Sequence, residues 1–81
     1  MIKLTRSEPL KNMHRFYALH LAPTLFGEWS LITEWGRIGS AGKVMHRTFQ
    51  TEGLAQTALA TRLKIKTRRG YRQWTRETAY P

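Results

Sequence analysis

Residues 27–39 read GEWSLITEWGRIG, and this stretch decides the fold class. In an extended chain, the odd-numbered residues from Trp29 to Trp35 face one side and the even-numbered residues between them face the other. This alternation, with its β-branched and aromatic content, is typical of a strand. Glycines at 36, 39 and 42 follow, so we expect the chain to bend or bulge at Gly36 and to turn at residues 40–42.

Two further strands are predicted beside this one. Residues 15–21, RFYALHL, alternate in the same way, and Pro23 then interrupts the pattern, so residues 22–25 form a short connection. Residues 43–49, KVMHRTF, form the strand after the glycine-rich turn. Because the connections are short, the strands form an antiparallel meander.

A helix is predicted over residues 52–67, which contain no proline, with Thr51 as its N-cap and Gly70 as a left-handed cap after its end. The apolar face of this helix is an arc that consists of Leu54, Ala55, Ala58, Leu59 and Leu63. Arg62 projects into the middle of this arc and interrupts it. The fold class is therefore α+β, a small antiparallel sheet of three to four strands with one helix packed across it.

The segments outside these elements complete the predicted organisation. Residues 1–11 show no sustained period and are expected to be a lead-in, with ordered structure beginning near Arg15. The domain covers residues 12–74, residues 71–74 add a last short strand or an extended segment, and residues 75–81 are a tail. No apolar run approaches the roughly 20 residues that span a bilayer. We expect a cytoplasmic protein, nucleoid-associated if bacterial, that is a monomer and has no membrane partner.

Composition excludes most kinds of catalytic site. An 81-residue chain has one thin core and little room for a deep cleft. With no cysteine it has no thiolate nucleophile and no cysteine zinc site, and its five acidic residues are all glutamates scattered one to an element. His14, His20 and His46 lack metal-ligand spacing. We expect no enzyme activity, no metal and no cofactor.

Charge points instead to a polyanionic partner. The chain carries 14 Lys and Arg residues against five acidic ones, a net charge of +9. Half of these cations lie in residues 62–76 without an acid between them, where they form either a ridge along a phosphate backbone or a solvated helix face. Aromatic residues of the chain either pack in the core or stack on bases, and the sequence favours neither role for Trp35. They are Tyr17, Trp29, Trp35, Tyr71 and Trp74.

One motif resembles a known signature. The string Trp35-Gly36-Arg37-Ile38-Gly39 resembles that of the WGR domain family, named for its first three letters. The resemblance extends over residues 12–74 and includes other positions that fit the family's pattern. These are Phe16, Tyr17, Leu19 and Leu21 in the first strand, Gly42 and Phe49 around the third, and Lys66, Thr67, Gly70 and Tyr71 at the helix end.

The resemblance implies a non-catalytic binding domain, found in DNA-dependent poly(ADP-ribose) polymerases and as short bacterial proteins. It assigns to Trp35 stacking on a sugar at the 5′-terminated strand of a break, to Arg37 a contact role, and to Gly36 the freedom for the backbone to turn. Without the polymerases' zinc fingers, regulatory domain and transferase domain in these 81 residues, we expect Arg37 to bind phosphate. Glu34, directly before the motif, is expected to weaken or orient binding locally.

We therefore predict a module that binds DNA rather than RNA, at ends, nicks or distorted duplex, with little sequence readout. The predicted contact residues are Trp35, Gly36, Arg37, Lys43, Arg47, Lys66, Arg68 and Arg69. The alternative is a protein-interaction adaptor that recruits or regulates an acidic or DNA-processing partner.

Overall fold

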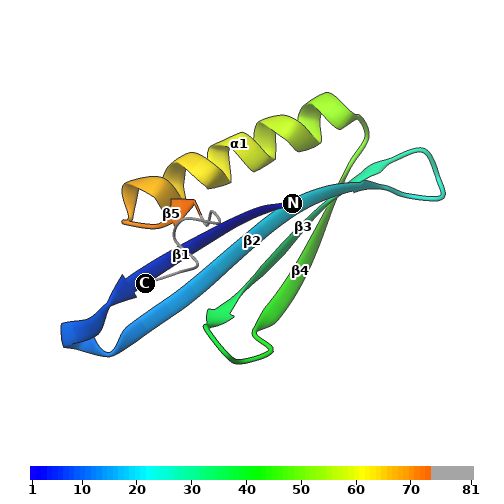
Figure 1. The fold of residues 1–81 in the computed structure, drawn as a ribbon. Coiled ribbons are helices and arrows are strands. Elements are labelled where there is room, and N and C mark those ends of the chain that lie inside the picture. The colour runs from blue at the N-terminus through cyan, green and yellow to red at the C-terminus, as the bar shows by residue number, and fades with distance from the viewer. Residues whose placement is uncertain (74–81) are drawn as a thin grey trace.

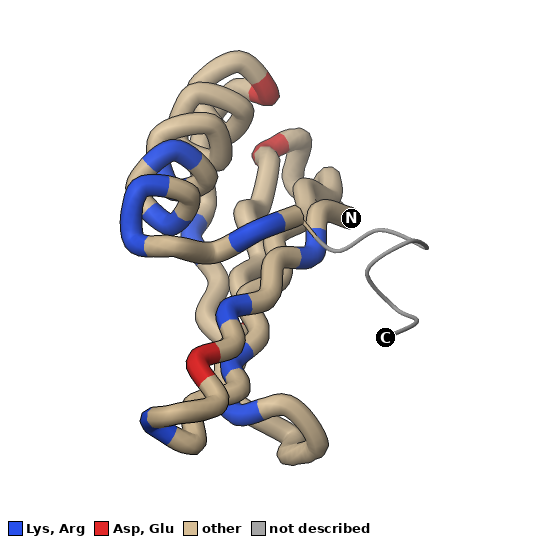
Figure 2. Tube along the Cα trace, turned by 60° about the vertical axis from the view of Figure 1, so that its left-hand side comes forward, with Lys and Arg blue, Asp and Glu red and all other residues tan. Residues whose placement is uncertain are grey.

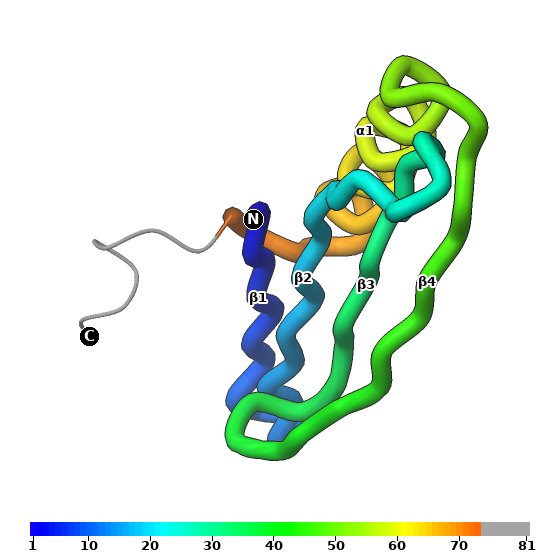
Figure 3. The backbone as a smooth tube through the Cα atoms, turned by 90° about the vertical axis from the view of Figure 1, so that its right-hand side faces the viewer, coloured from blue at the N-terminus to red at the C-terminus, as the bar shows by residue number. Residues whose placement is uncertain are grey.

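Antiparallel strands in the order β4-β3-β2-β1-β5 form one sheet of five, and a single helix crosses one of its faces (Figure 1 and Figure 3). This computed structural model describes residues 1–73. Its elements are β1 (Ile2–Glu8), the short 3₁₀ helix η1 (Pro9–Lys11), β2 (Met13–Pro23), β3 (Trp29–Arg37), β4 (Lys43–Phe49), α1 (Glu52–Arg68) and β5 (Arg72–Gln73). The predictions for Trp74, Arg76 and the tail at residues 75–81 lie outside the described residues.

The α+β class, the central strands and the helix are confirmed, although the sheet has more strands than expected. The connection expected at residues 22–25 begins later, because β2 continues through Ala22 and Pro23, which pair with Ser30 and Trp29. Thr51 caps α1 as predicted, because its hydroxyl accepts a hydrogen bond from the backbone N–H of Leu54 at 3.2 Å. Gly70 follows the helix with a φ of +95°, and its N–H donates to the Thr67 carbonyl. The helix ends one residue later than the sequence indicates.

The expectation of a lead-in before Arg15 is wrong, because the first residues form β1. This strand pairs with β2 from Ile2↔Leu19 to Glu8↔Met13, so it lies inside the sheet, with β5 on its other side. Its pattern was hidden because apolar side chains occupy only the first half of one face, whereas the second half carries Arg6 and Glu8. Leu4 is 1% exposed and belongs to the core.

The core lies between α1 and the sheet. It consists of Leu4, Tyr17, Leu19, Leu31 and Tyr71, with helix residues Ala58, Leu59 and Leu63 packed against it. Leu54, which the sequence places on the buried arc, is instead 54% exposed. Arg62 is half-buried, so a charged side chain lies where the helix meets the sheet. No helix among the described residues is long and apolar enough to cross a membrane.

The predicted bend at Gly36 is also wrong. Pairing between β2 and β3 continues without interruption through Phe16↔Gly36 and Arg15↔Arg37, so Trp35 keeps the face that strict alternation gives it. Gly36 matters for another reason, since a Cβ built there would lie 2.7 Å from the Cα of Gly42 and 3.4 Å from the ring of Phe16. The glycines let the two arms of the β3–β4 hairpin approach each other under that ring.

Replacing Gly42 with alanine should lower the free energy of unfolding by about 1–3 kcal/mol. Gly42 has a φ of +72°, and an added Cβ would collide with the Trp35 carbonyl oxygen. Gly53→Ala is the control, because a methyl group at Gly53 in α1 meets open space, and it should stabilise by about 0.4–1 kcal/mol. Urea denaturation followed by circular dichroism measures both variants. Equal stability of Gly42→Ala and wild type would contradict the close approach.

Candidate nucleic-acid interface

Register alone gathers basic side chains on the helix-covered face of the sheet. Arg6 on β1 lies opposite Arg15 on β2, and Arg15 lies opposite Arg37 on β3, so three arginines form one row across three strands. The next row toward the middle of the sheet pairs Tyr17 with Trp35. Cations and aromatic rings from distant parts of the sequence therefore lie in adjacent rows.

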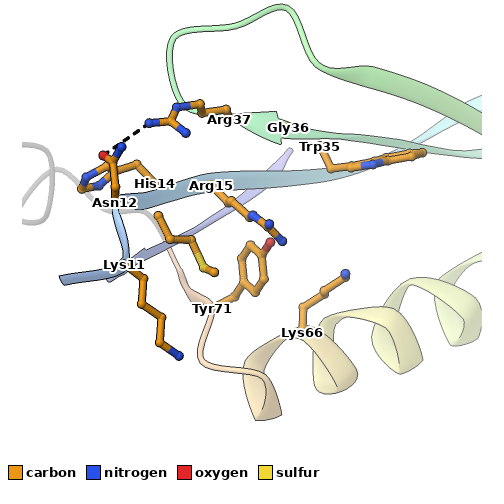
Figure 4. A pocket seen from close by; sticks show the side chains of 10 residues that line it. Lys11, Asn12, His14, Arg15, Trp35, Gly36, Arg37, Lys66 and Tyr71 are labelled. Carbon is orange, nitrogen blue, oxygen red and sulfur yellow. Dashed lines mark hydrogen bonds between the residues drawn. The ribbon is translucent and has the colours of Figure 1, made fainter. Parts of the chain in front are cut away.

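A hollow of about 560 Å³ opens where these rows meet the C-terminal end of α1 (Figure 4). We call it the Trp35 hollow. Its lining consists of Lys11, Asn12, Met13, His14, Arg15, Trp35, Gly36, Arg37, Lys66 and Tyr71. Figure 4 shows the Arg15 and Lys66 side chains between Trp35 and Tyr71, with Arg37 at the outer end. Four cations and two aromatic rings in one open cavity suit an anionic ligand with a flat group.

Aromatic contacts hold the inner wall of this hollow in place. The rings of Tyr17 and Trp35 stack with their centroids 6.3 Å apart and an angle of 26° between their planes. Tyr71 meets Tyr17 edge-on at 6.3 Å, and the Lys66 ammonium lies 4.6 Å from the Tyr17 ring centroid. Tyr17 and Tyr71 are buried, whereas Trp35 is half-buried. Trp35 is thus anchored on the core and still open to a ligand.

Acidic residues leave most of the hollow's charge uncompensated. Glu8 accepts a hydrogen bond from Arg6 at 2.6 Å and lies 3.4 Å from the Lys11 ammonium, and the bond from Arg6 lowers the pKa of this carboxyl. Among residues 1–73, no carboxylate pairs with Arg15, Arg37 or Lys66. Blue segments accordingly gather at the C-terminal end of α1 and along the nearby sheet, whereas α1 starts with a red one (Figure 2).

Arg37 is oriented by the hairpin between β1 and β2. Its Nη2 donates to the Asn12 side-chain oxygen at 3.4 Å, a bond drawn in Figure 4. Asn12 has a φ of +50°, an uncommon conformation for a residue other than glycine, and its N–H donates to the Pro9 carbonyl to close η1. The Ile38 N–H also donates to the His14 carbonyl at 2.8 Å. The exposed guanidinium is therefore held at the rim of the hollow.

Burial and repulsion both act on the Lys66 ammonium. Its pKa is lowered first by burial and then by the positive charges of Arg69, Arg62 and Arg15. In the alkaline range between this lowered pKa and the ordinary value of 10.5, the unfolded state binds more protons, so stability rises with pH. At neutral pH the desolvation and repulsion of the charged Lys66 therefore oppose folding, whereas its contacts with the Tyr17 and Tyr71 rings favour it. A bound phosphate would supply the missing counter-charge.

Lys66→Gln should consequently keep or raise the melting temperature at pH 7 while weakening DNA binding. The substitution removes a desolvated charge and replaces the ammonium over the Tyr17 ring with a neutral amide. Thermal melting by circular dichroism and fluorescence-anisotropy titration with a labelled duplex measure the two effects. A marked loss of stability at neutral pH would show that Lys66 is structural and that its repulsion with Arg62 and Arg69 is unimportant.

The structure brings together half of the predicted contact residues. Trp35, Gly36, Arg37 and Lys66 all line the Trp35 hollow. Lys43 lies opposite Trp35 on the exposed edge strand β4, and Arg47 packs its guanidinium 5.2 Å from the ring of Phe49 further along that strand. Arg68 and Arg69 at the end of α1 are exposed outside the hollow, and Arg69 faces a separate cavity beside β1.

Some residues of the hollow were absent from the predicted contact set. Arg15, Lys11 and Asn12 line it, and the sequence signal for Arg15 was its position two residues before Tyr17, on the same strand face. Glu34 pairs with Ala18 and lies on the opposite face of the sheet, so it does not enter the hollow. Among residues 1–73, no three His or Glu side chains gather closely enough to hold a metal ion.

Comparison with known proteins identifies the family. The family model described as "WGR domain" matches residues 1–78, nearly the whole chain. The chain belongs to the WGR domain family. This match begins at residue 1, which agrees with the position of β1 in the sheet. The WGR domain is a non-catalytic domain that is associated with nucleic-acid binding in polymerases of the poly(ADP-ribose) type.

A curated relative supports this membership. The WGR domain is 42% identical over 67 residues to the uncharacterized protein y4dW of Sinorhizobium fredii (strain NBRC 101917 / NGR234). The aligned part is 83% of this chain and 33% of the relative, so the chain spans about a third of that protein's length. No solved structure matches the chain.

Proposed function

We propose that this WGR domain is a non-catalytic DNA-binding module that recognises ends, nicks or distorted duplex with little sequence readout. The observation that carries the proposal is the convergence of Trp35, Arg37 and Lys66 with Arg15 in one hollow. An intact duplex keeps the flat faces of its bases stacked inside and presents mainly its backbone to such a surface. A strand end also exposes a sugar and a terminal phosphate, which suit the ring and the cations respectively.

Each part of the hollow has a role in this proposal. Trp35 stacks on the exposed sugar or base, while Arg15, Arg37 and Lys66 bind phosphate oxygens. Lys43, Arg47, Arg68 and Arg69 lie outside the hollow and attract the flanking backbone, which releases condensed counterions and makes affinity fall as salt rises. Specificity for discontinuities comes from the hollow, whereas general affinity comes from the charge around it.

Fluorescence anisotropy with nicked, blunt-ended and closed circular duplexes of the same sequence, at two salt concentrations, tests the proposal. We expect tighter binding to nicked and blunt DNA than to closed circles, with affinity falling as salt rises. Competition with an RNA duplex of the same sequence should show a preference for DNA. Equal binding to every DNA form would mean that the module binds DNA nonspecifically, through its positive charge alone.

A protein-interaction adaptor is the second candidate, and one surface favours it. The turn between β2 and β3 exposes Leu25 and Phe26 almost completely. The Thr24 hydroxyl accepts hydrogen bonds from the N–H groups of Phe26 and Glu28, so the turn has a defined shape. Apolar side chains held outward in this way fit an apolar partner surface. Absence of DNA binding at moderate salt would favour this function over the first.

A further inference from the structure

A second, shallower hollow of about 270 Å³ lies between α1 and β4, on the other side of Trp35 and Lys66 from the first. We call it the α1–β4 niche. Tyr17, Trp35, Met45, Arg62 and Lys66 line it. Its character differs from that of the Trp35 hollow, because two aromatic rings and a thioether form the walls while the cations lie among them. Met45 and Arg62 have no role in the function proposed above.

The niche exists because the helix leaves the edge of the sheet uncovered. Met45 pairs with the buried Thr33 and lies on the helix-covered face, yet Met45 is 40% exposed. Arg62 occupies the middle of the inner arc of α1 and is half-buried, so a cation rather than an apolar side chain lines the helix side of the niche. Met45 and Trp35 keep exposed apolar surface beside it.

We infer that the α1–β4 niche binds one unpaired nucleobase, so that the substrate class is a DNA end or nick whose terminal nucleotide is unpaired. This inference rests on the proposed function. The indole of Trp35 provides a stacking surface, the Met45 sulfur adds a polarizable contact, and the Arg62 guanidinium can lie over a base. A shallow space of this size suits a single base rather than a base pair.

Continuity between the two hollows favours a nucleotide over an aromatic side chain of a protein. Trp35 and Lys66 line both, so a ligand in the niche has its next chemical group at the Trp35 hollow. In a nucleotide the deoxyribose joins the base to an anionic phosphate, which would reach Arg15 and Lys66 in the Trp35 hollow. A peptide carries no obligatory anion at this distance from an aromatic side chain. The arrangement of an apolar niche beside a cationic hollow therefore matches a base linked through its sugar to a phosphate.

The test compares three duplexes of the same sequence: one blunt, one with a single-adenosine overhang, and one whose overhang nucleotide is abasic. Wild type should bind the adenosine overhang about 5- to 100-fold more tightly than the abasic one, the range that base stacking gives. A 2-aminopurine at the overhang should lose fluorescence on binding. Both readouts are measured at one salt concentration.

Two variants with the same change in charge show whether the preference for the base-bearing overhang depends on the niche. Met45→Glu places a carboxylate in the niche, whereas Val44→Glu places one on the neighbouring residue, 53% exposed and on the opposite sheet face. Met45→Glu should lose the preference for the base-bearing overhang and the 2-aminopurine quenching while still binding blunt ends. Val44→Glu should keep both.

The outcomes separate this inference from the proposed function. If wild type prefers ends to closed circles but binds adenosine and abasic overhangs equally, the niche does not hold a base and the proposed function stands. If both glutamate variants lose the overhang preference alike, the effect is one of net charge and the inference is overturned. If wild type does not distinguish ends from closed circles, the proposed function fails and the inference fails with it.

Discussion

Replacing Leu4 with alanine should lower the free energy of unfolding by about 2–5 kcal/mol, the cost of emptying a fully buried leucine site. Leu4 is 1% exposed, lies in the core cluster, and pairs with Tyr17 on one side and Gln73 on the other. A domain of this length has roughly 4–12 kcal/mol of stability in total. The substitution should therefore remove a large fraction of it.

Leu10→Ala provides the control for this prediction, because Leu10 in η1 is fully exposed and its truncation should change stability by less than about 0.5 kcal/mol. Urea denaturation of both variants, followed by far-ultraviolet circular dichroism, gives the two values. If Leu4→Ala is as stable as Leu10→Ala, the first strand is not part of the core and the account of the fold is wrong.

Arg15→Glu should weaken binding to DNA ends by about 10- to 100-fold. Arg15 lines the Trp35 hollow between Arg6 and Arg37 and has no carboxylate partner among residues 1–73. A charge-assisted hydrogen bond contributes about 1.5–3 kcal/mol, which corresponds to this range. The new carboxylate would also attract the neighbouring cations and occupy the space of the phosphate. Because Arg15 is exposed, the variant should fold.

Lys64→Glu makes the same charge change on an exposed residue of α1 that lines neither hollow. It should weaken binding to ends and closed circles alike, and by less than Arg15→Glu does. Anisotropy titrations with blunt and closed DNA at equal salt compare the two variants. Similar losses for both would mean that net charge, rather than the hollow, determines affinity.

The fold was predictable where the pattern is local. In strand β3, alternating residues of the sequence identify the two faces of the strand. Helix α1 has an N-cap, a run without proline and a glycine after its end. Strand β1 was missed because its second half places Arg6 and Glu8 on the core-side face, where they pair with each other beyond the end of the helix. Its assignment depends on pairing with β2, which no single segment reveals.

The candidate site was predictable only in part, for a related reason. Trp35, Arg37 and Lys66 stand out by motif and by charge density. Arg15 joins them because the register of β2 and β3 sets it opposite Arg37, and Lys11 joins them because the hairpin through η1 returns to the same end of the sheet. The dense run of basic residues also contains Arg68 and Arg69, but these two residues lie at the end of α1 outside the hollow.

The ratio of affinities for blunt and closed circular DNA, determined for Trp35→Ala and Arg69→Ala, tests end recognition by Trp35 most directly. Trp35 lines both hollows, whereas Arg69 lies outside them. We predict that Trp35→Ala brings the ratio close to one, while Arg69→Ala weakens both affinities and keeps the wild-type ratio. A folded Trp35→Ala variant that retains the wild-type preference for ends would contradict the role of Trp35 in end recognition.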